Sequence, residues 1–167
     1  MKDTHGVIHI HSCPVALAPN VEWTISHVLG TTVQLSWSDQ SCEPGTVRAS
    51  MEWSGPAGSA ARCTSALRGW DQTRFEVWEP TGDGRDGVRY AHTPALGVFF
   101  TLTDAAGNSM VGEDRVRYAM ELAQGDAAEL EHELARALGF AWDDELEPYR
   151  QTATNLVTPL RQRTSAN

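Results

Sequence analysis

Residues 6–13 read Gly6-Val7-Ile8-His9-Ile10-His11-Ser12-Cys13. Apolar β-branched residues alternate with other residues in this stretch, which predicts a β-strand, and Pro14 ends the run. Successive side chains of a strand point to opposite faces. We therefore expect Ile8 and Ile10 to face a layer of helices, whereas His9 and His11 share the other face, with Cys13 in register beside them.

The residues that follow predict five more elements. These are a helix from Pro19 to Gly30, strands at 32–38 and 47–53, a helix that Ser59 caps and Gly69 ends, and a strand at 74–79. The order strand, helix, strand, strand, helix, strand over residues 6–80 is that of a ferredoxin-like β-α-β-β-α-β core. We therefore expect an α+β fold.

The rest of the chain predicts additions to this core within one domain of residues 1–151. Residues 81–110 indicate a β-hairpin, with strands at 88–92 and 98–103, that extends the sheet or covers its open face. Residues 111–151 form a helical extension with segments at 113–123, 127–138 and 143–151, and we expect Pro148 to end or kink the last one. Residues 152–167 are polar, and we expect a mobile tail.

Composition excludes several classes of protein. The 167 residues carry a net charge of -9, and this argues against binding nucleic acid or an anionic membrane, which needs clustered Lys and Arg. No apolar run reaches the roughly 18 residues of a membrane span. The first residues lack the basic and apolar regions of a signal peptide, so we expect a cytoplasmic location. The three cysteines are widely spaced and we expect reduced thiols.

The two histidines of the first strand are the strongest candidate for a site. In the ferredoxin-like order, the neighbouring strands place Arg48, Glu52, Glu76 and Trp78 on the same open face as His9 and His11. This face has three interpretations: a structural surface, either half-polar or a histidine layer hydrogen-bonded beneath the hairpin, a metal site, or a polar face for a ligand or for acid-base catalysis. In the last case His9, His11, Glu52 and Glu76 are the catalytic candidates, and Arg48 and Trp78 bind ligand. We expect no metal and no cofactor, because two imidazoles on one strand are an incomplete ligand set.

A turn rich in glycine before the second helix gives a weaker signal. Gly55, Gly58 and Ser59, with Arg62 one turn later, can hold an anion at a helix N-terminus. The turn matches no nucleotide-binding fingerprint, and a turn from strand to helix needs glycine in any case.

The third candidate is acidic. Residues 104–150 contain twelve acids and four arginines, and the acids include Asp143, Asp144, Glu145 and Glu147. These four carboxylates are either solvated residues at a helix start or a surface that binds a basic partner protein.

Several strings also carry a resemblance: Pro19-Asn20-Val21-Glu22-Trp23, Gly55-Pro56-Ala57-Gly58-Ser59, Ser65-Ala66-Leu67-Arg68-Gly69-Trp70, Asp86-Gly87-Val88-Arg89-Tyr90 and Trp142-Asp143-Asp144-Glu145-Leu146-Glu147-Pro148-Tyr149-Arg150. Together they resemble an actinobacterial family of small cytoplasmic proteins catalogued as domain of unknown function 3145. The resemblance covers residues 6–150 and implies no activity, cofactor or catalytic residue. It does imply a partner among lipid-synthesis enzymes, because family members are encoded near genes of fatty-acid synthesis.

The sequence therefore favours a binding role over catalysis. We expect a regulatory or protein-binding subunit, with an enzyme of fatty-acid or lipid synthesis as its partner. The alternative is a small-molecule enzyme or ligand sensor that uses His9, His11, Arg48, Glu52 and Glu76 on the open face of the sheet.

Overall fold

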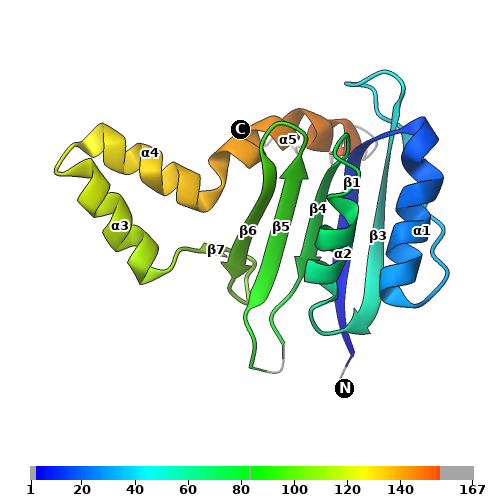
Figure 1. Ribbon diagram of the computed structural model, residues 1–167, viewed down its shortest axis with the longest axis horizontal. Coiled ribbons are helices and arrows are strands. Elements are labelled where there is room, and N and C mark those ends of the chain that lie inside the picture. The colour runs from blue at the N-terminus through cyan, green and yellow to red at the C-terminus, as the bar shows by residue number, and fades with distance from the viewer. Residues whose placement is uncertain (1–2, 83, 155–167) are drawn as a thin grey trace, which may run out of the picture.

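The computed structural model describes residues 3–82 and 84–154, and shows an α+β protein built on one antiparallel sheet (Figure 1). Seven strands lie in the order β2-β3-β1-β4-β5-β6-β7. The strands are β1 (Asp3–Pro14), β2 (Ser38–Asp39), β3 (Thr46–Pro56), β4 (Arg74–Glu79), β5 (Gly87–Thr93), β6 (Gly97–Thr103) and β7 (Ser109–Met110). The helices are α1 (Ala18–Leu29), α2 (Ser59–Leu67), α3 (Glu113–Ala123), α4 (Ala127–Leu138) and α5 (Phe140–Thr154), with a 3-10 turn at Val15–Leu17.

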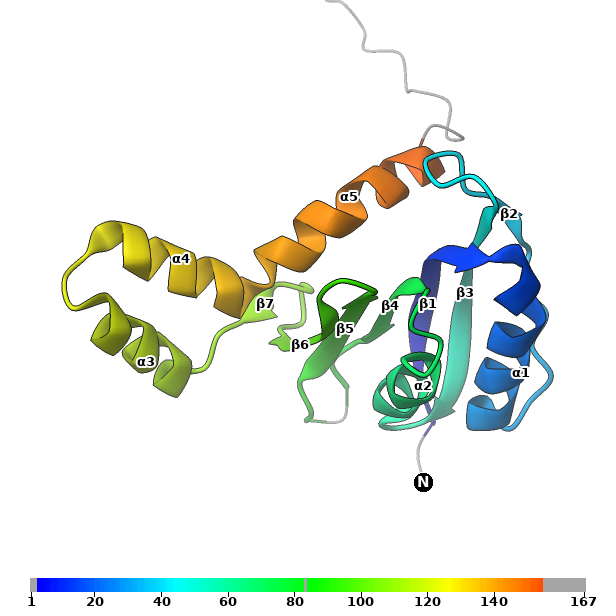
Figure 2. The ribbon, with the colours of Figure 1, turned by 45° about the horizontal axis from the view of Figure 1, so that its top comes forward.

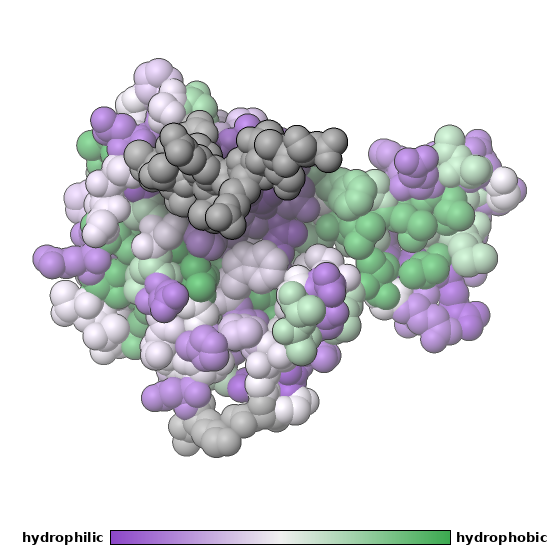
Figure 3. All heavy atoms as spheres, turned by 180° about the vertical axis from the view of Figure 1, so that it is seen from behind, coloured by the Kyte–Doolittle hydropathy of each residue, from purple (hydrophilic) through white to green (hydrophobic). Residues whose placement is uncertain are grey.

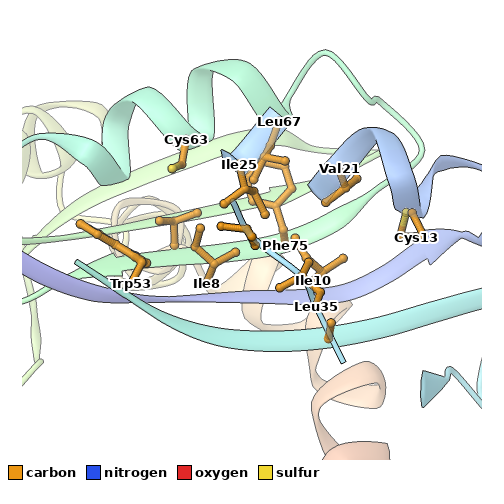
Figure 4. Packing of buried hydrophobic residues seen from close by; sticks show 14 of the residues in the cluster. Ile8, Ile10, Cys13, Val21, Ile25, Leu35, Trp53, Cys63, Leu67 and Phe75 are labelled. Carbon is orange, nitrogen blue, oxygen red and sulfur yellow. The ribbon is translucent and has the colours of Figure 1, made fainter. Parts of the chain in front are cut away.

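Helices α1 and α2 pack on one face of β1, β3 and β4 and form the main core there (Figure 4). Ile8 of β1, Ile25 of α1, Leu67 of α2 and Phe75 of β4 are all fully buried in this core. Burying a side chain of this kind stabilises the fold by about 1.5–3 kcal/mol. The prediction that Ile8 and Ile10 face a helical layer is therefore confirmed.

The prediction of a strand at 32–38 is wrong for most of that range. Residues 32–37 run without a strand partner, and only Ser38 and Asp39 pair with β3. Side chains of α1 bind this segment instead: the amide of Val33 donates to Ser26 Oγ over 2.9 Å, and the amide of Leu35 donates to Glu22 Oε1 over 2.8 Å. Glu22 and Ser26 thus satisfy backbone groups that would otherwise pair in a sheet.

The alternation of β1 is interrupted after Ile10. The pairing with both neighbouring strands shifts register between Ile10 and Cys13, as a β-bulge does. Cys13 consequently lies in the apolar core and not beside His11, which corrects the expected register. Burial raises the pKa of the Cys13 thiol to about 11, so the thiol is protonated near neutral pH.

The expected hairpin extends the sheet, since β5 pairs with β4 and β6 pairs with β5. The other face of the sheet is covered in part by α5, whose Leu146 is fully buried against Ala91 and Phe99 in a second, smaller core. Helix α5 follows Gly139 (φ 81°), where a Cβ would lie 2.5 Å from the ring of Phe99. Glycine therefore permits the close turn that brings α5 onto the sheet.

Helix α5 continues through Pro148 to Thr154, so of the two expected effects of this proline, the end of the helix does not occur. Residues 152–154 of the expected mobile tail belong to this helix, and residues 155–167 lie outside the described residues.

Helices α3 and α4 form a hairpin that projects from the end of the sheet, and we call this hairpin the arm (Figures 1 and 2). Asp126 caps α4 by accepting hydrogen bonds from the amides of Ala128 and Glu129. The buried Glu133 lies between Arg115 and Arg136, at 3.4 and 2.7 Å. In the part of the chain described here, no helix combines the length and the apolar character needed to cross a membrane.

Candidate functional site

A cleft of about 1010 Å³ lies on the face of the sheet opposite α1 and α2. Its floor is formed by outward-facing residues of β1, β3 and β4, and its walls by α5 and by residues 103–107, at the end of β6 and in the turn before β7. Of the sequence-predicted residues, His9, His11, Arg48, Glu76, Trp78 and Asp143 line it. The open face of the sheet is therefore a hollow with polar groups on its floor.

Glu76 is the centre of a network of ionic hydrogen bonds in this cleft. The residue is 4% exposed, and its carboxylate accepts hydrogen bonds from His11 Nε2 at 2.8 Å, from Arg89 at 2.8 and 3.0 Å, and from Arg150 at 2.8 and 3.0 Å. Burial alone would raise the pKa of Glu76, but the hydrogen bonds from His11 and Arg150 hold it well below its usual range. Glu76 is thus a carboxylate anion, and it is poorly suited to act as a general base.

A second carboxylate completes the network from α5. Asp143 accepts a hydrogen bond from Arg150 Nη2 at 2.9 Å and a closer one from Arg89 Nη2. Burial would lower the pKa of Arg89, but its bonds to Asp143 and the charge of Glu76 raise it above its ordinary value. Two guanidinium groups therefore lie between one carboxylate of the sheet and one of the helix, and the network fastens α5 to the sheet.

His9 lies beside this network without bonding to Glu76. Its Nδ1 is 2.9 Å from Ser50 Oγ, and its ring is stacked on that of His11 with 5.9 Å between centroids. Burial lowers the pKa of His9, as do the neighbouring His11 and Arg150, whereas Glu76 raises it. His9 is therefore neutral near pH 7 and can accept a proton or a hydrogen bond from a molecule in the cleft.

Arg48 and Trp78 occupy different parts of the floor. Within residues 3–82 and 84–154, the guanidinium of Arg48 forms no ion pair, and its Nε is buried without a hydrogen-bond partner. The indole of Trp78 lies under the guanidinium of Arg89, with 5.3 Å from Cζ to the ring centroid.

The structure does not bring Glu52 to this site. Glu52 is exposed, pairs with Val7 on β1 and does not line the cleft. It thus lies two residues along β3 from Ser50, beyond the polar floor.

The glycine-rich turn before α2 lies on the other side of the sheet and already binds a carboxylate. Glu79 of β4 accepts hydrogen bonds from the amides of Gly58 and Ala60, at 3.0 and 3.1 Å. Arg62 donates to Ser59 Oγ at 2.8 Å, and a Cβ added at Gly55 would lie 3.2 Å from the same hydroxyl. The anion at this helix start is therefore the side chain of Glu79 itself.

The four acids of α5 divide into inner and outer residues. Asp143 belongs to the network, and Glu145 pairs with Arg74 at 3.3 Å. Glu147 lies 3.6 Å from Arg150 and is exposed, as is Asp144. Asp144 and Glu147 are thus the two of the four that present a charge to the solvent.

The cleft does not resemble a metal centre. Within the described ranges, no three His, Cys, Asp or Glu side chains come together as a metal would require. Nδ1 of His9 is bonded to the hydroxyl of Ser50, and Nε2 of His11 is bonded to the carboxylate of Glu76.

A comparison with known families matches residues 7–162 to the model of a protein family of unknown function, DUF3145. The chain belongs to this family. No curated protein and no solved structure matches it. All residues of the cleft network lie within the span that the DUF3145 model covers.

Two members of this DUF3145 site, Arg89 and Arg150, were missed as functional residues by the reasoning from sequence. A signal for Arg150 existed, because Asp143, Glu147 and Arg150 recur at the spacing of one helix face. Arg89 shares a face of β5 with the buried Ala91, and an arginine in such a position requires an anionic partner. That this partner is Glu76 depends on strand pairing, which the sequence does not state.

Proposed function

We propose that this DUF3145 protein binds a small organic molecule in the cleft on the open face of its sheet. The observation that carries the proposal is the hollow of about 1010 Å³ with converging polar side chains, since ligand sites are typically concave and about 300–1,000 Å³ in volume. The network around Glu76 fixes the floor and α5 in place, which gives a binding site a preformed shape. A role as a ligand sensor or regulatory subunit follows from this site.

The test uses a substitution that fills the cleft and a matched one that does not. Ser50 and Ser54 are both exposed on β3 and point to the same face, but only Ser50 lines the cleft. In a thermal-shift screen of a metabolite library, ligands that raise the melting midpoint of the parent protein should do so for Ser54→Trp and not for Ser50→Trp. A library without any stabilising compound that depends on Ser50 would contradict the proposal.

A second candidate function, a subunit that binds another protein, is favoured by the arm. Tyr118, Met120 and Leu122 on α3 are 48%, 59% and 44% exposed, and apolar side chains that gather on one exposed surface mark sites of protein contact. Apolar residues gather on the arm and beside it in Figure 3. On this proposal the partner is a lipid-synthesis enzyme, as the resemblance implies, and the arm carries the contact.

Cross-linking in native cells tests this second candidate. Met120→Glu should abolish cross-links to a lipid-synthesis enzyme, whereas Glu121→Gln, at an exposed neighbouring position, should retain them. Equal cross-linking by both variants would show that the arm is not the contact.

We also propose that β2-β3-β1-β4 with α1 and α2 is a ferredoxin-like core. The strand order and the placement of both helices on one face support this assignment. The hairpin β5-β6 and α5 are then the additions that turn its open face into a cleft.

A further inference from the structure

Arg48 differs from every other arginine that lines the cleft. Arg89 and Arg150 are each bound to Glu76 and Asp143, but Arg48 has no ionic partner within the described part of the chain. Its Nε is buried and lacks a hydrogen-bond partner. A buried donor without a partner costs free energy, so an acceptor at this position would be favourable.

We propose that the cleft binds an organic anion, with the charged group against Arg48 and an aromatic or other apolar ring toward Trp78. This inference rests on the proposed function and names the chemical class of the ligand. The anionic group is a carboxylate, phosphate or sulfonate, which share the oxygen acceptors that a guanidinium binds.

Other hydrogen-bonding groups surround Arg48. Ser38 of β2 pairs with Arg48 across the strands, and Ser50 follows Arg48 on the same face of β3. The imidazole of His9 is bonded to the hydroxyl of Ser50. All four side chains line the cleft, and together they offer hydroxyl, guanidinium and imidazole groups to one anion.

The neighbouring carboxylates do not cancel the charge of Arg48. The two negative charges of Glu76 and Asp143 are balanced by the two positive charges of Arg89 and Arg150. These four residues together therefore carry no net charge. Asp104 lies in the turn between β6 and β7, where it accepts hydrogen bonds from the amides of Ala106 and Asn108. Among the described residues, Arg48 is therefore the charged side chain on the floor of the cleft that lacks a partner of opposite charge.

The separation of Arg48 from Trp78 sets the shape of the ligand. The two residues lie on strands on either side of β1. Trp78 is opposite Val7 of β1, and Arg48 is opposite a point four residues farther along β1. Strand geometry then places their backbones about 16 Å apart. An inorganic anion fills only the Arg48 end, whereas an anion that carries a ring system also reaches the indole side, where stacking and apolar contact add to the affinity.

A pair of fluorescent probes separates the contribution of charge from that of the ring. Anilinonaphthalene sulfonate and phenylnaphthylamine have the same rings, and only the first is an anion. We expect the sulfonate to bind at least about tenfold more tightly than phenylnaphthylamine, because a hydrogen bond to a charged group raises the affinity by about this factor. Arg48→Gln should remove the difference, and Arg68→Gln, an exposed arginine at the end of α2 on the other side of the sheet, should retain it.

A second measurement uses the unmodified protein. The NMR signal of the Arg48 Nε–H should shift on addition of the sulfonate and not on addition of the neutral probe. If both probes bind equally and shift the signals of His9 and Ser50, the cleft binds ligands but the assignment of an anion to Arg48 is wrong. If neither probe shifts those signals, the proposed function and this inference both fall.

Discussion

The two faces of β1 are stabilised in different ways. Ile8 and Ile10 are buried by α1, α2 and the neighbouring strands, and each contact is apolar and insensitive to direction. On the opposite face, His11 bonds to Glu76, which also binds Arg89 and Arg150 from elements far along the chain. The apolar face tolerates small changes of shape, whereas the polar face needs every member of its network, because a buried charge without its partners is costly.

The largest effect is expected when the centre of the network is removed. Glu76→Ala leaves two guanidinium groups facing each other without the carboxylate between them, and we expect a loss of about 3–5 kcal/mol in the free energy of unfolding. Ile8→Val, which trims one methyl group from the apolar face, should cost only about 1 kcal/mol. Urea denaturation measures both. Equal losses would show that the two faces do not differ as described.

The next prediction concerns acid. The pKa of Glu76 is lowered in the folded protein, so its contribution to stability is fully present above the unfolded-state pKa of about 4.3 and is lost as the pH falls toward the lower folded-state value. The parent protein should therefore lose stability below about pH 4.3 more steeply than Glu76→Gln. Urea midpoints of both proteins between neutral and acidic pH provide the comparison, and parallel curves would contradict it.

A smaller effect separates two histidines on opposite faces, the half-buried His9 and the buried His92. His92 stacks on Phe75 with 4.9 Å between centroids, and burial lowers its pKa, as it does that of His9. Arg150→Gln removes a positive charge near His9 and also leaves Glu76 less neutralised, and both changes raise the pKa of His9. The charged groups that act on His92 are Asp71 and Glu145, so the pKa of His92 should stay constant when Arg150 is replaced. NMR titration of the two rings measures this, and a shift of both would show that α5 affects the whole sheet.

Local patterns predicted most of the apolar face. Alternation and helix-end residues gave the elements at 59–67 and 74–79, because the side chains that define those elements also form the core. The segment at 32–37 was predicted wrongly, since the decisive partners are the side chains of Glu22 and Ser26 and not a neighbouring strand. A pattern of alternation does not reveal which acceptor a backbone amide finds.

The candidate site was predictable only in part. Residues on β1 and on its two neighbours, such as His11 and Glu76, follow from strand order and side-chain alternation. The contribution of α5 does not follow, because Asp143 lies 67 residues after Glu76 in the sequence and the return of the helix to the sheet depends on Leu146 and on the turn at Gly139. Acidity at 143–147 indicated either solvated residues at a helix start or a surface for a partner, whereas Asp143 and Glu145 form ion pairs within the protein.

The smallest effect is expected at Glu52, which the sequence placed with Glu76 and the structure leaves apart. Glu52 is exposed on the same face as Glu76 and outside the cleft, with no hydrogen bond or ion pair to the described residues. Glu52→Gln should therefore change the free energy of unfolding by no more than about 0.5 kcal/mol, as is usual for exposed positions. Its acid-induced loss of stability should follow that of the parent, and its affinity for anilinonaphthalene sulfonate should stay the same. Because Glu76→Gln makes the same chemical change to a buried carboxylate, the pair isolates the effect of the network. A loss at Glu52 as large as that at Glu76 would show that the polar face responds to its total charge and not to the hydrogen bonds that surround Glu76.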